Sequence, residues 1–426
     1  MNALHTVTVH GTLQILALRA IALFLAFGAT TCFSARLDPT EEDKAPEPRA
    51  GASFGAAVAI SGDTVMVGMP THNQVLGRVG VYTRKAEGWV RTATIPNPKP
   101  DSEQSELFGR DLDLGGHSVV VDAHNEAYLF RKQGKRWDLI GAFGRSDPIT
   151  TLGSSVAYSN GFMARSIQAY RINEDESQSE LPGVVRVYEQ CKRAIRRVAT
   201  LRASDAAPTD RFGVSLAMDR GVLVVGAPGV GAAYVFVRDG NQWVQRQKLV
   251  SSDGGVGDFG TSVAIRNGMI LVGAPGVDVP DWREGEMTSP EGKVYAFLPS
   301  RRGWYESQQL NNDGQFYLAF GTNVALSRDL AVAVSPINVP ASWSRSTVIA
   351  FDRVSAHLTS VAGGMSTGDD GSRVIDVDAS KRGFIVGVQE SMNWGGPTSG
   401  WVEVVELPAE GTDASANLDA ASTAAH

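Results

Sequence analysis

The sequence predicts an all-β fold, a seven-bladed β-propeller of four-stranded antiparallel blades. A Phe-Gly pair recurs along the chain and is followed at a fixed interval by a second short motif. Each full unit contains four strand-like segments separated by turn residues, and successive units begin 44 to 61 residues apart. Self-similarity at this period, with four strands in each unit, is typical of propeller blades.

The two motifs keep the same register in several units. The copies are Phe54-Gly55 with Gly68-Met69-Pro70, Phe212-Gly213 with Gly226-Ala227-Pro228, Phe259-Gly260 with Gly273-Ala274-Pro275, and Phe320-Gly321 with Val334-Ser335-Pro336. Degenerate units fill the gaps, so that unit starts fall at residues 54, 108, 152, 212, 259, 320 and about 373. Seven units predict seven blades.

Residues 212–249 illustrate the four strands of one unit. Residues 214–218 alternate apolar and small side chains, as in a half-buried strand, and residues 222–226 form a continuous apolar run, as in a buried one. Residues 233–237 form the third strand, and residues 243–249 alternate as an outer strand that begins with Trp243. A Trp at this position recurs in other units, where we expect it to fill the wide outer edge of a blade.

The last unit has only three strands, of which the third runs from Trp401 to Leu407. Residues 33–37 have the position of the missing fourth strand, so we predict that the N-terminal segment completes the last blade and closes the ring. Closure would remove an unpaired strand edge that favours aggregation. The propeller is therefore expected to span residues 33–408, followed by a disordered tail at residues 409–426.

Residues 1–32 have the order of a secretory or lipoprotein signal. Arg19 precedes an apolar run at residues 20–27, and small residues follow up to Cys32. The sequence therefore predicts a secreted, periplasmic or cell-envelope protein, with lipid attachment at Cys32 as an alternative to simple cleavage.

The charge balance limits the class of partner. The formal net charge is -7 and the isoelectric point is about 5.6. No long basic stripe is present, which argues against nucleic acid as a partner.

The repeated Phe-Gly and Gly-Ala-Pro motifs, with the Val-Tyr-Val-Phe type of third strand, resemble the FG-GAP repeat family. That family forms the propeller of integrin alpha chains and occurs in many secreted bacterial proteins. The resemblance covers about residues 54–407 and implies a seven-bladed propeller. Calcium-binding members carry an Asp-rich loop between the first two strands, whereas this chain has tight turns there, such as Asp219-Arg220-Gly221. Calcium needs six to eight oxygen ligands, so we expect no metal in the blades and no cofactor.

The loops between the second and third strands of the last three units are unusual. They contain Trp282 and Arg283, Trp343 and Arg345, and Trp394. The integrin resemblance places ligand contacts on this face, and Trp and Arg are frequent in binding hot spots. These five residues are the predicted binding site. The alternative is that each Trp folds back and caps its own blade.

No catalytic residue is assigned, because no His, Cys or carboxylate motif has a recognisable catalytic context. The sequence favours a non-catalytic binding or adhesion scaffold for a protein or glycan ligand. One alternative is a propeller enzyme, a polysaccharide lyase or hydrolase, with a site at the ring axis. Another is a domain whose partner chain supplies the activity.

Overall fold

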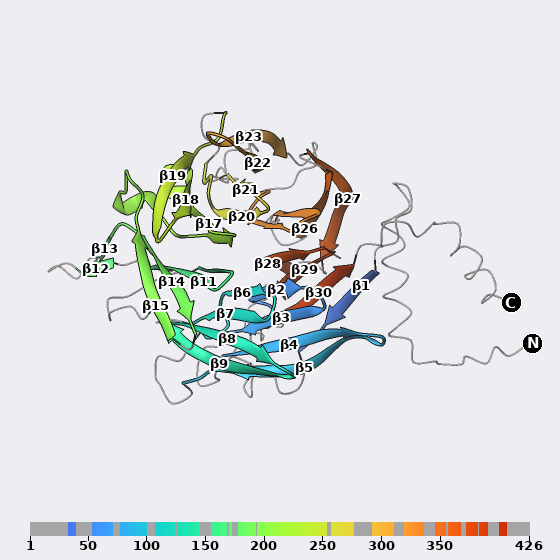
Figure 1. The fold of residues 1–426 in the computed structure, drawn as a ribbon. Coiled ribbons are helices and arrows are strands. Elements are labelled where there is room, and N and C mark those ends of the chain that lie inside the picture. Colours follow the sequence, from blue (N-terminus) through green and yellow to red (C-terminus); the bar gives the residue numbers. More distant parts are fainter. Residues whose placement is uncertain are drawn as a thin grey trace, which may run out of the picture. The chain divides into compact units, whose positions relative to one another are not determined.

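A computed structural model confirms the predicted fold class. It shows seven four-stranded antiparallel sheets arranged as a seven-bladed β-propeller (Figure 1). The described residues are 33–39, 53–70, 77–99, 107–123, 126–144, 155–167, 170–172, 178–192, 194–253, 257–276, 292–310, 319–335, 346–354, 357–367, 372–381, 383–390 and 400–406. Within these ranges, no helix has the length and apolar character needed to span a membrane.

Five blades follow a Phe-Gly pair, and in each the chain runs through four consecutive strands. They are blade 1 with β2 (Ala57–Ser61), β3 (Thr64–Met69), β4 (Arg78–Lys85) and β5 (Gly88–Pro96); blade 2 with β6 (Leu112–Gly115), β7 (Ser118–Asp122), β8 (Ala127–Gln133) and β9 (Arg136–Phe143); blade 4 with β16 (Leu216–Asp219), β17 (Val222–Ala227), β18 (Ala232–Asp239) and β19 (Gln242–Leu249); blade 5 with β20 (Ser262–Arg266), β21 (Met269–Ala274), β22 (Lys293–Ser300) and β23 (Gly303–Leu310); and blade 6 with β24 (Asn323–Leu326), β25 (Leu330–Ser335), β26 (Ser346–Val354) and β27 (His357–Thr367).

Two blades lack the Phe-Gly pair, and blade 3 also carries an extra hairpin between its second and third strands. They are blade 3 with β10 (Val156–Ser159), β11 (Phe162–Ile167), β14 (Val184–Cys191) and β15 (Ala194–Leu201), with the hairpin β12 (Tyr170–Ile172) and β13 (Gln178–Glu180); and blade 7 with β28 (Ser372–Ser380), β29 (Gly383–Glu390), β30 (Gly400–Glu406) and β1 (Phe33–Leu37). Two short 3-10 helices, η1 (Pro208–Asp210) and η2 (Pro228–Val230), lie in the connections of blade 4.

The first strand of each blade contacts the first strand of both neighbouring blades, and β28 of blade 7 contacts β2 of blade 1. The first strands therefore form the inner ring. The residues from Ala35 to Val404 make one compact unit, while Met1–Ser34 and Val405–His426 are assigned to another.

The N-terminal strand completes the last blade, as predicted. β1 lies beside β30 in the sheet order β1-β30-β29-β28. The Arg36 guanidinium stacks 4.5 Å from the centroid of the Trp401 ring, and Leu37 is buried with residues of blades 7 and 1. Cation–π stacking and apolar burial thus hold the first strand against the end of the chain.

Within a blade, one hydrogen bond explains the fixed interval between the two motifs. The Gly55 N–H donates to the Gly68 carbonyl at 3.1 Å, and the Gly213 N–H donates to the Gly226 carbonyl at 2.8 Å. The Phe-Gly glycines have φ values of 83 to 101°, which L side chains rarely adopt. The glycine thus turns the chain into the first strand while bonding the end of the second.

Between blades, the second motif of one blade contacts the first motif of the next. A Cβ added at Gly68 would overlap the Gly109 carbonyl oxygen, and one at Gly226 would overlap the Gly260 carbonyl oxygen. The pairs Gly273–Gly321 and Gly387–Gly55 show the same approach. The motif glycines are therefore required by the interface between blades, because the two backbones approach too closely to leave room for a side chain.

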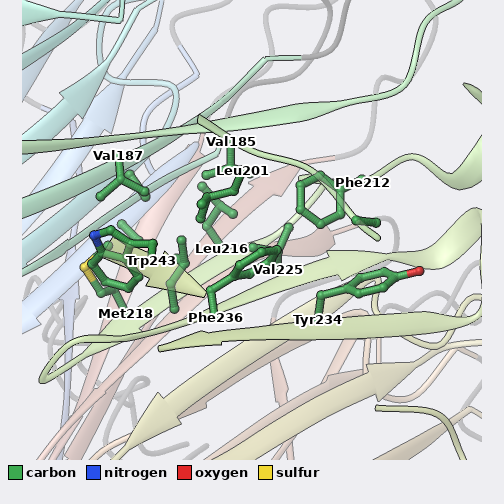
Figure 2. Packing of buried hydrophobic residues seen from close by; sticks show 14 of the residues in the cluster. Val185, Val187, Leu201, Phe212, Leu216, Met218, Val225, Tyr234, Phe236 and Trp243 are labelled. Carbon is green, nitrogen blue, oxygen red and sulfur yellow. The ribbon is translucent and has the colours of Figure 1, made fainter. Parts of the chain in front are cut away.

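The Phe of each Phe-Gly pair fills the space between two blades. The side chains of Phe54, Phe108, Phe212, Phe259 and Phe320 are at most 1% exposed. Phe212 packs edge-on against Tyr234 and Phe236 of its own blade, with centroid distances of 5.6 and 6.1 Å. Figure 2 shows this core, which blade 3 completes with Val185, Val187 and Leu201. Trp243 is 9% exposed in the same core, so its predicted packing role is confirmed.

The interface between blades 2 and 3 uses a buried ion pair instead. Asp122 occupies the position of the motif glycine in blade 2, and it is fully buried. Arg165 of β11, 1% exposed, donates from Nε to Asp122 at 2.9 Å and from its terminal nitrogens to the carbonyls of Gly144 and Ala123. The Arg110 side chain donates to the other Asp122 oxygen at 2.9 Å.

Candidate functional site

The five predicted binding residues, Trp282, Arg283, Trp343, Arg345 and Trp394, lie outside the described residues. The strands that flank their loops are described. The loops join β21 to β22, β25 to β26, and β29 to β30. Each is a connection between the second and third strands of blades 5, 6 and 7. In antiparallel blades these connections emerge at one end of the ring, which we call the loop face.

Tyrosine–acid–lysine clusters fasten the neighbouring connections on the loop face. In blade 4, the Tyr234 hydroxyl donates to Asp205 at 2.8 Å and Lys248 pairs with Asp205 at 2.6 Å. In blade 5, the Tyr295 hydroxyl donates to Asp253 at 2.9 Å and Lys293 pairs with it at 2.7 Å. Blade 2 has the same kind of cluster in Tyr128, Glu126 and Lys99.

The hydrogen bonds from Lys248 and Tyr234 lower the pKa of Asp205, so this carboxylate is ionised at neutral pH. In blades 4 and 5 the acid lies in the segment before the first strand and the Tyr lies at the start of the third, whereas in blade 2 Glu126 directly precedes the third strand and Lys99 lies before the first. The clusters therefore tie together the connections at the loop face, and their repetition in three blades marks them as part of the scaffold.

A second group of polar residues lies at the inner ring. Asp376 and Asp378 of β28 accept hydrogen bonds from the backbone N–H groups of Val58 and Ile60 in blade 1, both at 2.7 Å. Asp111 and Asp113 of blade 2 do the same for blade 3. Their carboxylates accept from the N–H groups of Val156 at 2.7 Å and Tyr158 at 2.6 Å. The inner strands have no ladder partner on their axial edge, so these carboxylates bind N–H groups that would otherwise need water.

Burial raises the pKa of all four carboxyl groups. The pKa of Asp113 rises to about 8, and repulsion from Asp378 and Asp111 adds to the effect of burial while Arg266 opposes it. Burial raises the pKa values of Asp111 and Asp378 to about 6 and that of Asp376 well above its usual range. All four side chains keep partial solvent exposure, as expected for groups that line the centre of a ring.

Three of the four axial carboxylates have hydrogen bonds to both oxygens. Asp111, Asp376 and Asp378 each also accept from the N–H of the following residue. This arrangement holds the inner strands together. Asp113 is partly exposed, and burial raises its pKa to about 8. In the part of the chain that the structure describes, no three His, Cys, Asp or Glu side chains are grouped to hold a metal ion.

Sequence reasoning missed the axial carboxylates, although a signal was present. When the units are aligned on their motifs, Asp111 and Asp376 fall at one position and Asp113 and Asp378 two residues later. The other blades have Ala, Ser or Asn at the first of these positions and Ala at the second. An Asp-x-Asp pattern in place of small residues marks the two exceptional blades.

The comparison with protein families supports the repeat assignment. Residues 195–236 and 243–297 match the FG-GAP repeat model, and the seven-bladed architecture is consistent with FG-GAP propellers. Such a propeller suggests a binding or scaffold role. No curated protein matches the sequence.

Among the similar solved structures, the first supports the fold alone. The WD40 domain of Toxoplasma gondii coronin is 8% identical with a TM-score of 0.50, and the match covers 90% of this chain and 88% of that one. A putative 6-phosphogluconolactonase from Bacteroides uniformis is 8% identical with a TM-score of 0.46, covering 74% of this chain and 86% of that one. The N-terminal domain of Nup159 is 13% identical with a TM-score of 0.42, and the match covers 89% of this chain and 96% of that one.

Proposed function

We propose that this chain, an FG-GAP-repeat β-propeller, is a non-catalytic binding scaffold of the cell envelope or the extracellular space. It binds a protein or glycan through the loop face of blades 5, 6 and 7. One observation carries the proposal. In three consecutive blades the second strand ends and the third begins at the same end of the ring, and the sequence that joins them contains one Trp in each blade. Three aromatic side chains on one rim suit stacking on sugars or insertion into a protein surface.

The signal-like residues 1–32 support a location outside the cytoplasm. The folded blades support a rigid platform, because buried aromatic side chains and backbone contacts lock each blade to the next. A rigid platform lowers the entropic cost of binding. The recognition energy then depends on the loops, as in other scaffolds whose binding residues lie between fixed strands.

Binding of the full chain to a glycan array and to envelope fractions tests the proposal. The test variant replaces Trp282, Trp343 and Trp394 with Ala. We expect saturable binding that weakens at least about 30-fold in this variant, since each hot-spot aromatic contributes about 1–2 kcal/mol or more.

The matched control replaces three exposed hydrophobic residues of the outer strands, Leu139, Val244 and Tyr305, with Ala. This variant should bind as the wild type does. Equal binding by wild type and the Trp variant would assign the tryptophans to blade capping and overturn the proposed site.

The axial carboxylates favour one alternative, a polysaccharide lyase or hydrolase with its site at the ring axis. Four partly exposed carboxyl groups, those of Asp111, Asp113, Asp376 and Asp378, lie on inner strands, where burial raises their pKa values. Depolymerisation of uronate-containing and neutral polysaccharides by the full chain would support it. The activity should then be lost in Asp113→Asn and kept in the Trp variant. An absence of depolymerisation would leave the scaffold role.

A further inference from the structure

The end of the ring opposite the loop face is strongly basic. At this end lie the short turns that join the first to the second strand and the third to the fourth strand of each blade, and we call it the hairpin face. Twelve exposed basic side chains lie in these turns or within two residues of them, and they are Arg84, Lys85, Lys135, Arg136, Lys192, Arg220, Arg238, Arg266, Arg301, Arg302, Arg328 and Lys381.

Acidic side chains are scarce at the same end. By the same criterion, the exposed acidic residues in the described part of the chain are Asp63, Glu87 and Asp239. Four of the basic residues have an acidic neighbour at 3.8 to 4.0 Å, as Arg266 has in Asp219. The arginines of these pairs are 36 to 82% exposed, and long pairs made by exposed side chains are weak. Because the whole chain has a net charge of -7, this concentration of positive charge is a property of the face and not of the composition.

The distribution of these charges favours a planar partner. Every one of the seven blades contributes at least one exposed base, so the charges surround the ring axis instead of following one track. The turns are short, as shown by Asn267-Gly268 and Arg301-Arg302, and they leave the face without long projecting loops. A linear polyanion would contact one side of such a ring, whereas a charged plane contacts all blades together.

The course of the N-terminal strand gives an independent argument. β30 starts at the loop face with Gly400 and Trp401, and the stacking of Arg36 on Trp401 shows that β1 ends beside that start. β1 therefore enters the blade from the hairpin face. In the sequence, the start of β1 directly follows the predicted signal segment, residues 1–32.

We propose that the hairpin face docks on a membrane surface rich in anionic lipids, with the loop face directed away from the bilayer. Stable membrane attachment commonly combines a hydrophobic anchor with a basic patch. Here a lipid on Cys32 would supply the first signal, and the hairpin face would supply the second. This inference stands apart from the loop-face ligand, since vesicle binding and ligand binding are measured separately.

Vesicle co-sedimentation of the full chain tests the proposal. One set of vesicles is phosphatidylcholine alone, and in the other about a third of the lipid is phosphatidylglycerol. The test variant changes Lys135, Arg301 and Arg302 to Gln. The matched control changes Arg202, Arg211 and Arg246, which are exposed but lie outside the hairpin face, to Gln.

We expect tighter binding to the anionic vesicles and a loss of about 10- to 100-fold in the test variant. The control should bind as the wild type does, and salt should weaken binding as the screening length shortens. Equal binding to both kinds of vesicle, or equal losses in both variants, would overturn the proposal. A competition with heparin gives a further test. If heparin releases the protein from the vesicles at a concentration of negative charge below that of the anionic lipid, the hairpin face prefers an acidic polymer, and the membrane proposal is overturned.

Discussion

At the residue scale, the glycines of the second motif allow two blades to pack closely. This role explains why glycine recurs at that position in several units. Each one faces a carbonyl of the next blade with no space for a methyl group. Two of the three units that lose this glycine are followed by units that lack Phe-Gly. Asp122 precedes the unit that begins Leu152-Gly153, and Val334 precedes the unit at about residue 373, whereas Ser166 precedes the intact Phe212-Gly213 pair. The loss of one motif is therefore accompanied by the loss of the other in two of three cases, as expected for groups that form one contact.

Replacing Gly273 with Ala should lower the free energy of unfolding by about 1–3 kcal/mol, because the added methyl group overlaps the Gly321 carbonyl. Urea unfolding followed by tryptophan fluorescence measures the change. The control is Gly240→Ala in an exposed turn, where no atom lies within 4 Å. It should cost about 1 kcal/mol, since only the positive φ opposes it. A smaller loss at Gly273 than at Gly240 would contradict the interface assignment.

The axial carboxylates predict how stability depends on pH. Their folded pKa values are raised, so the native state keeps protons that the unfolded chain releases above pH 3.8. The free energy of unfolding should therefore fall as the pH rises from about 4 to about 8. The Asp113→Asn variant keeps an acceptor for the Tyr158 N–H but has no charge, so its stability should fall less over this interval.

Thermal unfolding at pH 5 and pH 8 measures both chains. The Asp239→Asn variant, changed at an exposed turn residue, should follow the wild type. If Asp113→Asn also follows the wild type, Asp113 does not hold its proton as the axial environment indicates.

At the element scale, the contact between β7 and β11 replaces the repeated glycine contact by the Arg165–Asp122 pair. Loss of the Arg165 guanidinium would leave the buried Asp122 with Arg110 as its remaining cation and would remove the donors to the Gly144 and Ala123 carbonyls, and breaking a buried pair is strongly destabilising. Arg165→Met should therefore destabilise the protein by about 3–5 kcal/mol, whereas Arg136→Met, at an exposed pair 3.9 Å from Asp138, should change stability by less than about 1 kcal/mol. Chemical denaturation distinguishes the two. A loss at Arg165 no larger than that at Arg136 would show that apolar packing alone joins blades 2 and 3.

The elements themselves could be predicted from sequence to a large extent. The two motifs predicted seven units, because the close contacts between blades restrict which residues fit at the motif positions. The last unit lacked a fourth strand, and this predicted that residues 33–37 complete it. The Asp-x-Asp exceptions in two units could have marked the positions of the axial carboxylates, but the contacts of these residues and of the buried Arg165 could not be predicted, since their partners lie in other blades. The orientation of Trp282, Trp343 and Trp394 also does not follow from sequence, because long loops lack the short-range turn chemistry that fixes a hairpin.

At the scale of the whole molecule, ring closure depends on β1. Deleting residues 33–39 should expose the edge of β30, lower the thermal midpoint and promote self-association, because an unpaired edge strand pairs with other chains. Light scattering with size-exclusion chromatography detects the change, and Arg36→Ala serves as a milder variant that removes only the stacking on Trp401. A monomeric deletion variant with an unchanged midpoint would show that the last blade is stable with three strands.

The central claim is that the two ends of the propeller have different partners. Amide hydrogen exchange of the full chain, measured free, with anionic vesicles and with the strongest ligand from the binding panel, tests it most directly. We predict that the ligand protects residues 277–291, 336–345 and 391–399, while vesicles protect the turns at residues 134–135 and 301–302. Protection of the same residues by both partners would contradict the claim.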